Sequence, residues 1–171
     1  MIFILTGPVH SGKTTFLCHQ THIWKKKKLQ VDGFLSVRRG KGQTHLGYDL
    51  YDLKKEKSLP FIRKNGEPEW PRVGPYYFIP QSLKEAQNII FRGEESFLVV
   101  IDELGPLELK GQGLWPSLEQ ALFQRRNRFL LVVRESILDG IIHKLDNINT
   151  EVSEVFVPSP STQITEKVWR L

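Results

Sequence analysis

The chain has 171 residues, of which 40% are hydrophobic and 25% are charged, so we expect a globular protein with one domain over residues 1–171. The single cysteine, Cys18, excludes an internal disulfide and favours a reducing cytoplasm, and no apolar run reaches the roughly 18 residues that a membrane span requires. The formal net charge of +5 suits a phosphate-rich small molecule or nucleic acid, and equally a solvated basic surface.

Short apolar runs alternate with helical stretches along the chain, which is the pattern of an α/β fold. Residues 2–5 are continuously apolar and predict a strand buried on both faces. A helix is expected over residues 12–28, and Cys18 within it is interpreted as part of the core, with a reactive thiol as the alternative. The four lysines at 25–28 complement the negative end of this helix and should stay in solvent, with nucleic-acid binding as the alternative.

Extended structure is predicted for much of the next segment. Residues 31–38 and 46–53 predict two strands that form a hairpin or lie as neighbours, with turn residues between them. Residues 60–75 are rich in proline, glycine and charge and predict a loop, followed by a short strand at 76–79. Ser82 and Glu85 predict a capping box at the start of a helix that runs to about Phe91.

The second half of the chain predicts three more strands and two more helices. The strands are expected at 97–101, 129–133 and 155–157. The helices are expected at about 115–124 and 135–145.

Residues 7–14, Gly-Pro-Val-His-Ser-Gly-Lys-Thr, have the G-x-x-x-x-G-K-T spacing of a phosphate-binding loop, or P-loop. Gly7 and Gly12 permit backbone angles that turn successive N–H groups toward phosphate oxygens. Lys13 should reach the β- and γ-phosphates, and the Thr14 hydroxyl should bind Mg²⁺. The motif therefore predicts a bound nucleoside triphosphate, ATP or GTP, with Mg²⁺ as cofactor. The predicted nucleotide-binding set is Gly7, Pro8, Val9, His10, Ser11, Gly12, Lys13, Thr14 and Thr15.

His10 occupies one of the variable positions of the P-loop. An exposed residue at the tip of the loop is the simpler interpretation. A contact to the γ-phosphate or to a partner is the alternative.

Two adjacent carboxylates, Asp102 and Glu103, follow the apolar strand at 97–101. We expect this strand to lie beside the strand that leads into the P-loop, which would bring Asp102 to the shell of the Mg²⁺ ion. Glu103 projects differently and is a candidate to polarise an attacking water. Two solvated acids at a strand end are the alternative. Beside the P-loop, however, the pair predicts hydrolysis, with Glu103 and Lys13 as catalytic residues.

Charge that develops on a transferred phosphoryl group needs a further cation besides the P-loop lysine. Arg38 and Arg134 are candidates, as are Arg39 and Arg72. Arg134 directly follows the strand at 129–133, at the edge where parallel sheets place ligands, although a surface position at a helix start is the alternative. The basic group Arg125, Arg126 and Arg128 predicts a solvated helix end, with a lid or a nucleic-acid contact as alternatives.

In these segments the sequence resembles the cancer-related nucleoside-triphosphatase family, small stand-alone P-loop NTPases of the RecA-like division. The resemblance covers most of the chain and is carried by residues 7–15, 31–34 with 37–38, 47–49, 73–76 and, most specifically, 102–109. It implies a three-layer sandwich with a mainly parallel central sheet flanked by helices.

The resemblance also implies Mg²⁺-dependent hydrolysis of several nucleoside triphosphates to the diphosphate and phosphate. Lys13 and Thr14 would bind phosphate and Mg²⁺, Asp102 the metal shell, and Glu103 would act as the base. Glu108, in the family segment, is expected to support the loop after Glu103 by hydrogen bonding.

Two other functions share the P-loop. A small-molecule or nucleotide kinase would need an acceptor pocket, and the basic group at 125–128 is the lid-like feature of the chain. A non-catalytic switch would bind a protein or a nucleic acid instead, although no motif supports a nucleic-acid partner. The adjacent acids favour hydrolysis, and we expect a monomer.

Overall fold

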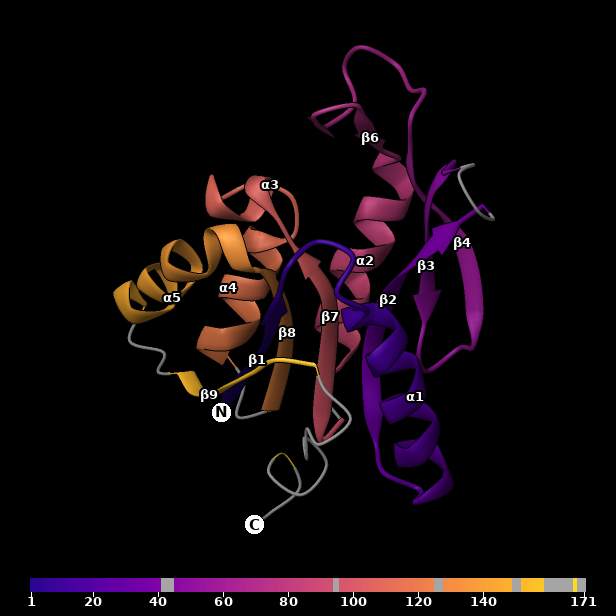
Figure 1. The fold of residues 1–171 in the computed structure, drawn as a ribbon. Helices are drawn as coiled ribbons and strands as arrows, with labels where there is room; N and C mark the ends of the chain where they lie inside the picture. The colour runs from indigo at the N-terminus through magenta and orange to yellow at the C-terminus, as the bar shows by residue number, and fades with distance from the viewer. Residues whose placement is uncertain (41–44, 94–95, 125–127, 149–151, 159–167, 169–171) are drawn as a thin grey trace.

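The computed structural model describes residues 1–40, 45–93, 96–124, 128–148, 152–158 and 168. Within these ranges nine strands form one sheet in the order β5-β6-β4-β3-β2-β7-β8-β1-β9 (Figure 1). The strands are β1 (Ile2–Gly7), β2 (Val31–Arg39), β3 (Gly47–Asp52), β4 (Lys57–Arg63), β5 (Arg72–Val73), β6 (Tyr76–Phe78), β7 (Leu98–Leu104), β8 (Arg128–Arg134) and β9 (Val152–Phe156). The helices are α1 (Lys13–Lys26), α2 (Pro80–Arg92), α3 (Pro106–Leu109), α4 (Trp115–Gln124) and α5 (Leu138–Asn147), with a 3₁₀ turn, η2 (Glu135–Ile137), before α5.

The sheet is mixed, so the expected mainly parallel sheet is wrong. Strands β2, β7, β8, β1 and β9 pair in parallel, whereas β3, β4, β5 and β6 add antiparallel ladders at one side. Residues 40–46 separate β2 from β3, and residues 53–56 separate β3 from β4. Connections this short can join only antiparallel neighbours, because a parallel pair needs a crossover of about a dozen residues or more. The hairpin expected over residues 31–53 is confirmed.

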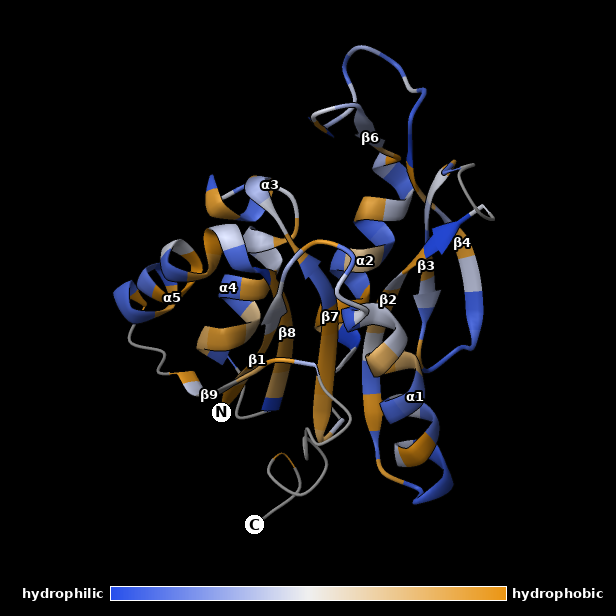
Figure 2. Ribbon diagram, in the orientation of Figure 1, coloured by the Kyte–Doolittle hydropathy of each residue, from blue (hydrophilic) through white to orange (hydrophobic). Residues whose placement is uncertain are grey.

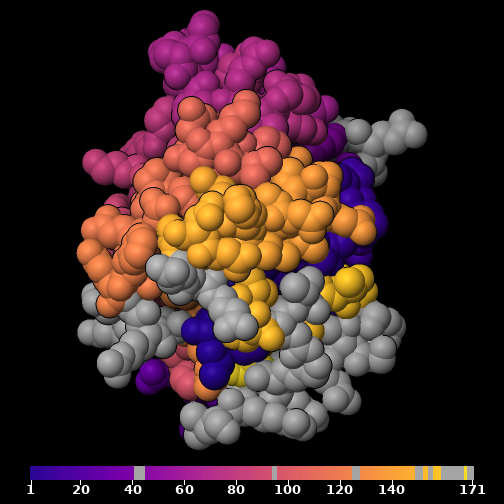
Figure 3. Space-filling view, turned by 90° about the vertical axis from the view of Figure 1, so that its left-hand side faces the viewer, coloured from indigo at the N-terminus to yellow at the C-terminus, as the bar shows by residue number. Residues whose placement is uncertain are grey.

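Part of the segment expected to be a loop is strand. Residues 57–63 form β4, and Pro60 lies opposite Asp49 where the register of the β3–β4 ladder shifts. A proline is tolerated at such an irregularity because it has no N–H to donate to the ladder. The loop that follows, with β5 and β6, protrudes at one end of the molecule, as Figures 1 and 3 show.

Helices cover both faces of the sheet, which confirms the α/β class. Helix α1 places Leu17 and Trp24, both fully buried, against one face. Helices α2, α4 and α5 pack on the other face (Figure 1). The central strands are the most apolar elements in Figure 2, as expected for strands covered on both sides.

The predicted capping box at Ser82 is wrong, because α2 begins two residues earlier, at Pro80. The Ser82 hydroxyl instead donates to the carbonyl oxygen of Pro60, at 2.5 Å, and Glu85 accepts a hydrogen bond from Lys55 at 2.9 Å. Proline suits the first helical position, since its fixed φ is helical and its missing N–H needs no partner there.

Strand β8 lies between the P-loop strand β1 and the acid-bearing strand β7, so the expected contact between those two strands is wrong. In the β1–β8 ladder Gly7 is the register partner of Arg134. All three strands are parallel, and their carboxyl ends therefore meet at one edge of the sheet. The topology thus places Arg134 between the P-loop and the acid pair.

None of the helices in the described ranges has the length and apolar character needed to cross a membrane.

Candidate active site

The P-loop connects β1 to α1, as the motif predicted. Gly7 and Gly12 have φ values of 146° and 84°, a region that side-chain-bearing residues rarely adopt. A Cβ on Gly7 would also lie 3.0 Å from the Ser11 hydroxyl oxygen. His10 is exposed at the tip of the loop with a φ of 64°, in agreement with the simpler interpretation.

The side chain of Lys13 is folded into the P-loop, and the residue is only 5% exposed. Its Nζ donates hydrogen bonds to the carbonyl oxygens of Gly7, at 2.9 Å, and Pro8, at 2.8 Å. The ammonium group is therefore held inside the loop by neutral acceptors.

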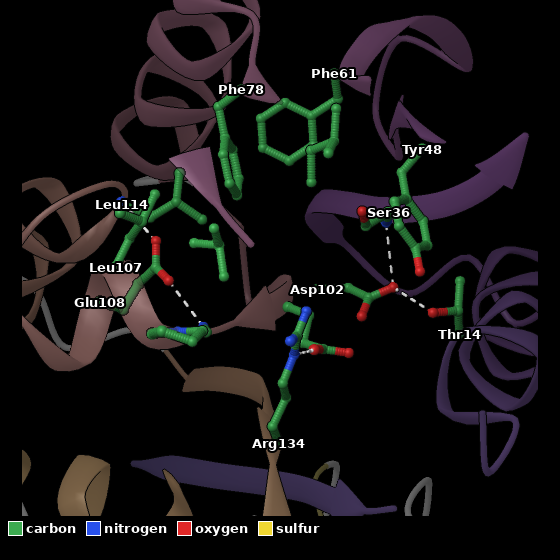
Figure 4. Close-up of a pocket in the computed structure, with 15 residues that line it drawn as sticks. Thr14, Ser36, Tyr48, Phe61, Phe78, Asp102, Leu107, Glu108, Leu114 and Arg134 are labelled. Carbon is green, nitrogen blue, oxygen red and sulfur yellow. Dashed lines mark hydrogen bonds and ion pairs between the residues drawn. The ribbon is translucent and has the colours of Figure 1, made fainter. Parts of the chain in front are cut away.

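Thr14 and Asp102 are in direct contact although 88 positions separate them in the chain. The Thr14 hydroxyl donates to Asp102 Oδ2 at 2.9 Å, and the backbone N–H of Ser36 donates to the same oxygen at 3.1 Å (Figure 4). Asp102 is fully buried, and its Oδ1 has no hydrogen-bond partner among the described residues. Burial, and secondly the charge of Glu103, raise the pKa of Asp102 to about 7.

Glu103 forms an ion pair with Arg134, whose Nε donates to Glu103 Oε1. The pair connects the end of β7 to the end of β8, so the structure brings together two residues that the sequence indicated separately. Of the other candidate arginines, Arg38 lines the same cleft as the P-loop. Arg39 instead pairs with Asp49, and Arg72 donates to the Tyr77 hydroxyl.

The basic group before β8 is placed only in part. Arg125 and Arg126 lie outside the described residues. Arg128 is the first residue of β8, with its guanidinium 4.1 Å from the Phe97 ring centroid and a hydrogen bond to the carbonyl of Val168. The expected solvated helix end is therefore wrong for Arg128.

A cleft of about 430 Å³ lies between the P-loop and the Glu103–Arg134 ion pair. The P-loop side of the cleft is formed by residues 9–15 and Cys18, which is exposed rather than part of the core as expected. The opposite side is formed by Ser36, Val37, Arg38, Tyr48, Glu103 and Arg134. The cleft thus faces the P-loop lysine on one side and Glu103 and Arg134 on the other.

Ser36 and Tyr48 belong to this site but were not predicted. Tyr48 packs edge-to-face against His45 and Tyr76, at centroid distances of 4.9 Å and 6.1 Å, and burial raises the pKa of its hydroxyl. Tyr48 does lie in the family segment at 47–49, which was the available signal. Ser36 contributes a backbone N–H, which no side-chain motif reveals.

Glu108 supports the loop after Glu103, as expected from the family segment. Its two oxygens accept hydrogen bonds from the N–H groups of Gly105, at 2.8 Å, and Leu114, at 3.0 Å. Glu108 is 3% exposed, and burial raises its pKa. The carboxylate therefore ties both ends of the α3 turn to each other.

Comparison with known proteins agrees with this geometry. The sequence profile of the NTPase family matches residues 2–161. The nucleoside-triphosphatase THEP1 of Archaeoglobus fulgidus is 31% identical over 139 residues, which cover 80% of this chain and 81% of the relative. The cancer-related nucleoside-triphosphatase homolog of Bos taurus is 30% identical over 128 residues, which cover 69% of this chain and 67% of the relative.

Two solved structures share the fold. The human cancer-related nucleoside triphosphatase has a TM-score of 0.69 at 24% identity, covering 96% of this chain and 92% of that one. THEP1 of the hyperthermophile Aquifex aeolicus has a TM-score of 0.70 at 18% identity, covering 97% and 94%. The resemblance noted in the sequence is confirmed: the chain belongs to the NTPase family and is a nucleoside-triphosphatase.

Proposed function

We propose that this protein binds a nucleoside triphosphate with Mg²⁺ and hydrolyses it to the diphosphate and phosphate, with loose choice of base. One observation carries the proposal: the Thr14 hydroxyl touches the buried Asp102 carboxylate at 2.9 Å, while Glu103 and Arg134 line the cleft beside them. The residues that we assign to phosphate binding, metal binding and proton acceptance thus lie in or beside one cleft.

The P-loop supplies the phosphate site. Its backbone N–H groups and the start of α1 favour an anion. Lys13 now contacts two neutral carbonyl oxygens. Hydrogen bonds to a charged acceptor are roughly twice as strong as those to a neutral one, so the ammonium group would transfer to the β- and γ-phosphates.

The residues around Asp102 fit a magnesium ion. Hydroxyl and carboxylate oxygens are the ligands that this hard cation prefers, and Asp102 Oδ1 is buried without a described partner. Thr14 and Asp102 would hold the ion. When bound, it would neutralise charge on the β- and γ-phosphate oxygens.

Glu103 and Arg134 would divide the chemical work. Glu103 would accept a proton from the attacking water, and Arg134 would stabilise the charge on the transferred phosphoryl group. The guanidinium has five N–H donors in one plane, and the bond to Glu103 uses Nε. The terminal nitrogens can therefore bind a phosphate oxygen while Glu103 stays in place.

Loose base choice is supported by the sequence, which contains no Asn-Lys-x-Asp segment of the kind that reads guanine. The names of the relatives, nucleoside-triphosphatases without a stated base, agree with this.

A steady-state panel of ATP, GTP, CTP and UTP hydrolysis, with Mg²⁺ or with EDTA, tests the proposal. Glu103→Gln should retain Mg-nucleotide binding and lose about 10²- to 10⁴-fold in kcat. Lys13→Ala should lose binding as well, whereas Lys26→Ala, the same change at an exposed position at the end of α1, should not. Equal rates in wild type, Lys13→Ala and Glu103→Gln would overturn the proposal. Negligible turnover that Glu103→Gln leaves unchanged, with nucleotide binding intact, would favour the non-catalytic switch.

A further inference from the structure

A second, smaller hollow adjoins the cleft on the side of the acid pair. It has a volume of about 70 Å³ and is shown in Figure 4. Its apolar walls are formed by Phe61, Ile62, Val73, Phe78, Leu107 and Leu114. The rings of Phe61 and Phe78 lie side by side across the hollow from Arg134. They meet edge-to-face, with centroids 5.6 Å apart and an interplanar angle of 88°.

The two hollows share several polar residues, whereas Asp102 and Glu108 line only the smaller one. Thr14, Ser36, Tyr48, Glu103 and Arg134 line both of them. The apolar hollow therefore opens onto the same carboxylate and guanidinium that face the phosphate cleft. A molecule in the apolar hollow would have its polar end at Glu103.

With a triphosphate in the P-loop, the hollow would lie on the side from which an attacking oxygen arrives. The groups at Thr14 and Asp102 would mark the γ-phosphate end, and the nucleoside would extend in the opposite direction. The attacking and leaving oxygens lie roughly in line with the transferred phosphorus. An acceptor at Glu103 would therefore occupy the position opposite the leaving diphosphate.

Hydrolysis alone gives no reason for these apolar walls, because water needs only the polar end. Protein interiors rarely leave a void much larger than one water molecule. Phe61 is held rigidly, since it is 2% exposed and also packs edge-to-face on Phe34 at 6.0 Å. The packing of side chains on β4 and β6 therefore fixes the walls of the hollow on that side.

We propose that this hollow is an acceptor site for a small alcohol, and that the protein transfers the γ-phosphoryl group to this alcohol as well as to water. An apolar cavity of about 150 Å³ accommodates benzene, so a hollow of about 70 Å³ suits an alkyl group of about three carbons. The alkyl body would lie against Phe61, Phe78 and Leu114, and the hydroxyl would face Glu103. The inference rests on the proposed binding of a triphosphate in the P-loop.

The transfer balances without any further reactant. The Glu103 carboxylate accepts the proton of the hydroxyl group, and the alcohol oxygen forms a bond to the γ-phosphorus. The bond between that phosphorus and the β–γ bridging oxygen breaks. The products are an alkyl phosphate monoester and the nucleoside diphosphate, and Glu103 then releases its proton to solvent.

The test incubates the full chain and Mg-ATP with propan-2-ol and follows phosphate and alkyl phosphate by ³¹P NMR. Alkyl phosphate should form saturably and at the expense of phosphate, and its ratio to phosphate should be about tenfold or more above that for glycerol at equal concentration. Glycerol serves as the control because it offers hydroxyl groups without an apolar body.

Two variants locate the acceptor site. Val73→Phe should fill the hollow and lower ester formation about tenfold while phosphate release without alcohol persists. Val31→Phe, the same change at the first residue of β2 and outside the lining of the hollow, is the matched control. Phe78→Ala should enlarge the hollow and shift the preference toward benzyl alcohol, which keeps the site testable if Val73→Phe does not fold.

The outcomes separate the two proposals. No phosphate release from the wild type without alcohol overturns the proposed hydrolysis. Normal phosphate release with no ester from propan-2-ol, or with equal ester from glycerol, overturns the acceptor site alone. Ester formation that neither folded variant alters also overturns it.

Discussion

Arg134 and Glu103 form an ion pair that links the carboxyl ends of β8 and β7. Their side chains remain 41% and 26% exposed. Exposed ion pairs typically contribute only about 0–1 kcal/mol to stability. The importance of this pair should therefore lie in catalysis rather than in folding.

Replacing Arg134 by alanine should lower kcat by about 10²- to 10³-fold, because the developing charge loses a donor and Glu103 loses its partner. The free energy of unfolding should change by less than about 1 kcal/mol. Steady-state kinetics and urea unfolding measure the two effects. Arg39→Ala, which removes an exposed arginine paired with Asp49 on β2 and β3, is the control. An unchanged kcat in Arg134→Ala would exclude the proposed role.

Asp102 should make the stability of the nucleotide-free and metal-free protein depend on pH. Its pKa is raised to about 7 in the folded chain, against about 3.9 for an aspartate in an unfolded chain. Between these values the folded state binds a proton that the unfolded state does not. The contribution of Asp102 to the free energy of unfolding should therefore fall as the pH rises from about 4 to about 7, and level off above.

The comparison of wild type with Asp102→Asn isolates this contribution from all other titrating groups. Urea unfolding in EDTA at pH 5, 6, 7 and 8 should show the wild type losing stability relative to the variant up to about pH 7. A difference that stays constant over this range would contradict the raised pKa.

Glu108→Ala should destabilise the protein by about 2–4 kcal/mol, because the buried N–H groups of Gly105 and Leu114 each lose their acceptor. Glu108→Gln keeps one acceptor oxygen and should cost less. Hydrolysis should fall in both variants, since the loop that follows Glu103 loses its support. Glu56→Ala, which removes an exposed carboxylate, is the control for urea unfolding. Equal stability of Glu108→Ala and wild type would show that the two hydrogen bonds are dispensable.

Gly33→Ala should be severely destabilising, by about 3 kcal/mol or more. Gly33 has a φ of 112°, and a Cβ there would lie 1.9 Å from the carbonyl oxygen of Val100 in the neighbouring strand β7. Gly74→Ala is the matched comparison, with a φ of 55° and no heavy atom within 4 Å, and should cost only about 1–2 kcal/mol. Thermal unfolding of both variants distinguishes the steric clash from the backbone preference, and similar losses would argue against the clash.

Several features could be predicted because they depend on neighbouring residues. The P-loop is a local arrangement, in which the glycines at 7 and 12 and the helix that follows them determine the path of the backbone. The buried strands at 2–5, 97–101 and 129–133 are recognisable because strands covered on both faces are continuously apolar. The support of the α3 turn by Glu108 was likewise expected from a single segment.

The expectations that proved wrong concern pairing between distant segments. An apolar run shows that a strand is buried but not which strand lies next to it, so the insertion of β8 between β1 and β7 was not foreseen. Pro60 favoured a loop, yet the ladder to β3 shifts its register at that residue and accommodates it. Ser82 has the type and spacing of a helix cap, but it lies within α2, and its hydroxyl donates a hydrogen bond to the carbonyl oxygen of Pro60 on β4.

The sequence by itself determined that the chain carries a P-loop and, elsewhere, two adjacent acids after a buried strand, because these motifs are written in consecutive residues. Only the tertiary structure decided that Thr14 touches Asp102, that Arg134 pairs with Glu103, and that an apolar hollow opens beside them. These contacts join residues on different strands and helices. Their geometry follows from the strand order and from the packing of side chains across it, neither of which a linear pattern of residue types specifies.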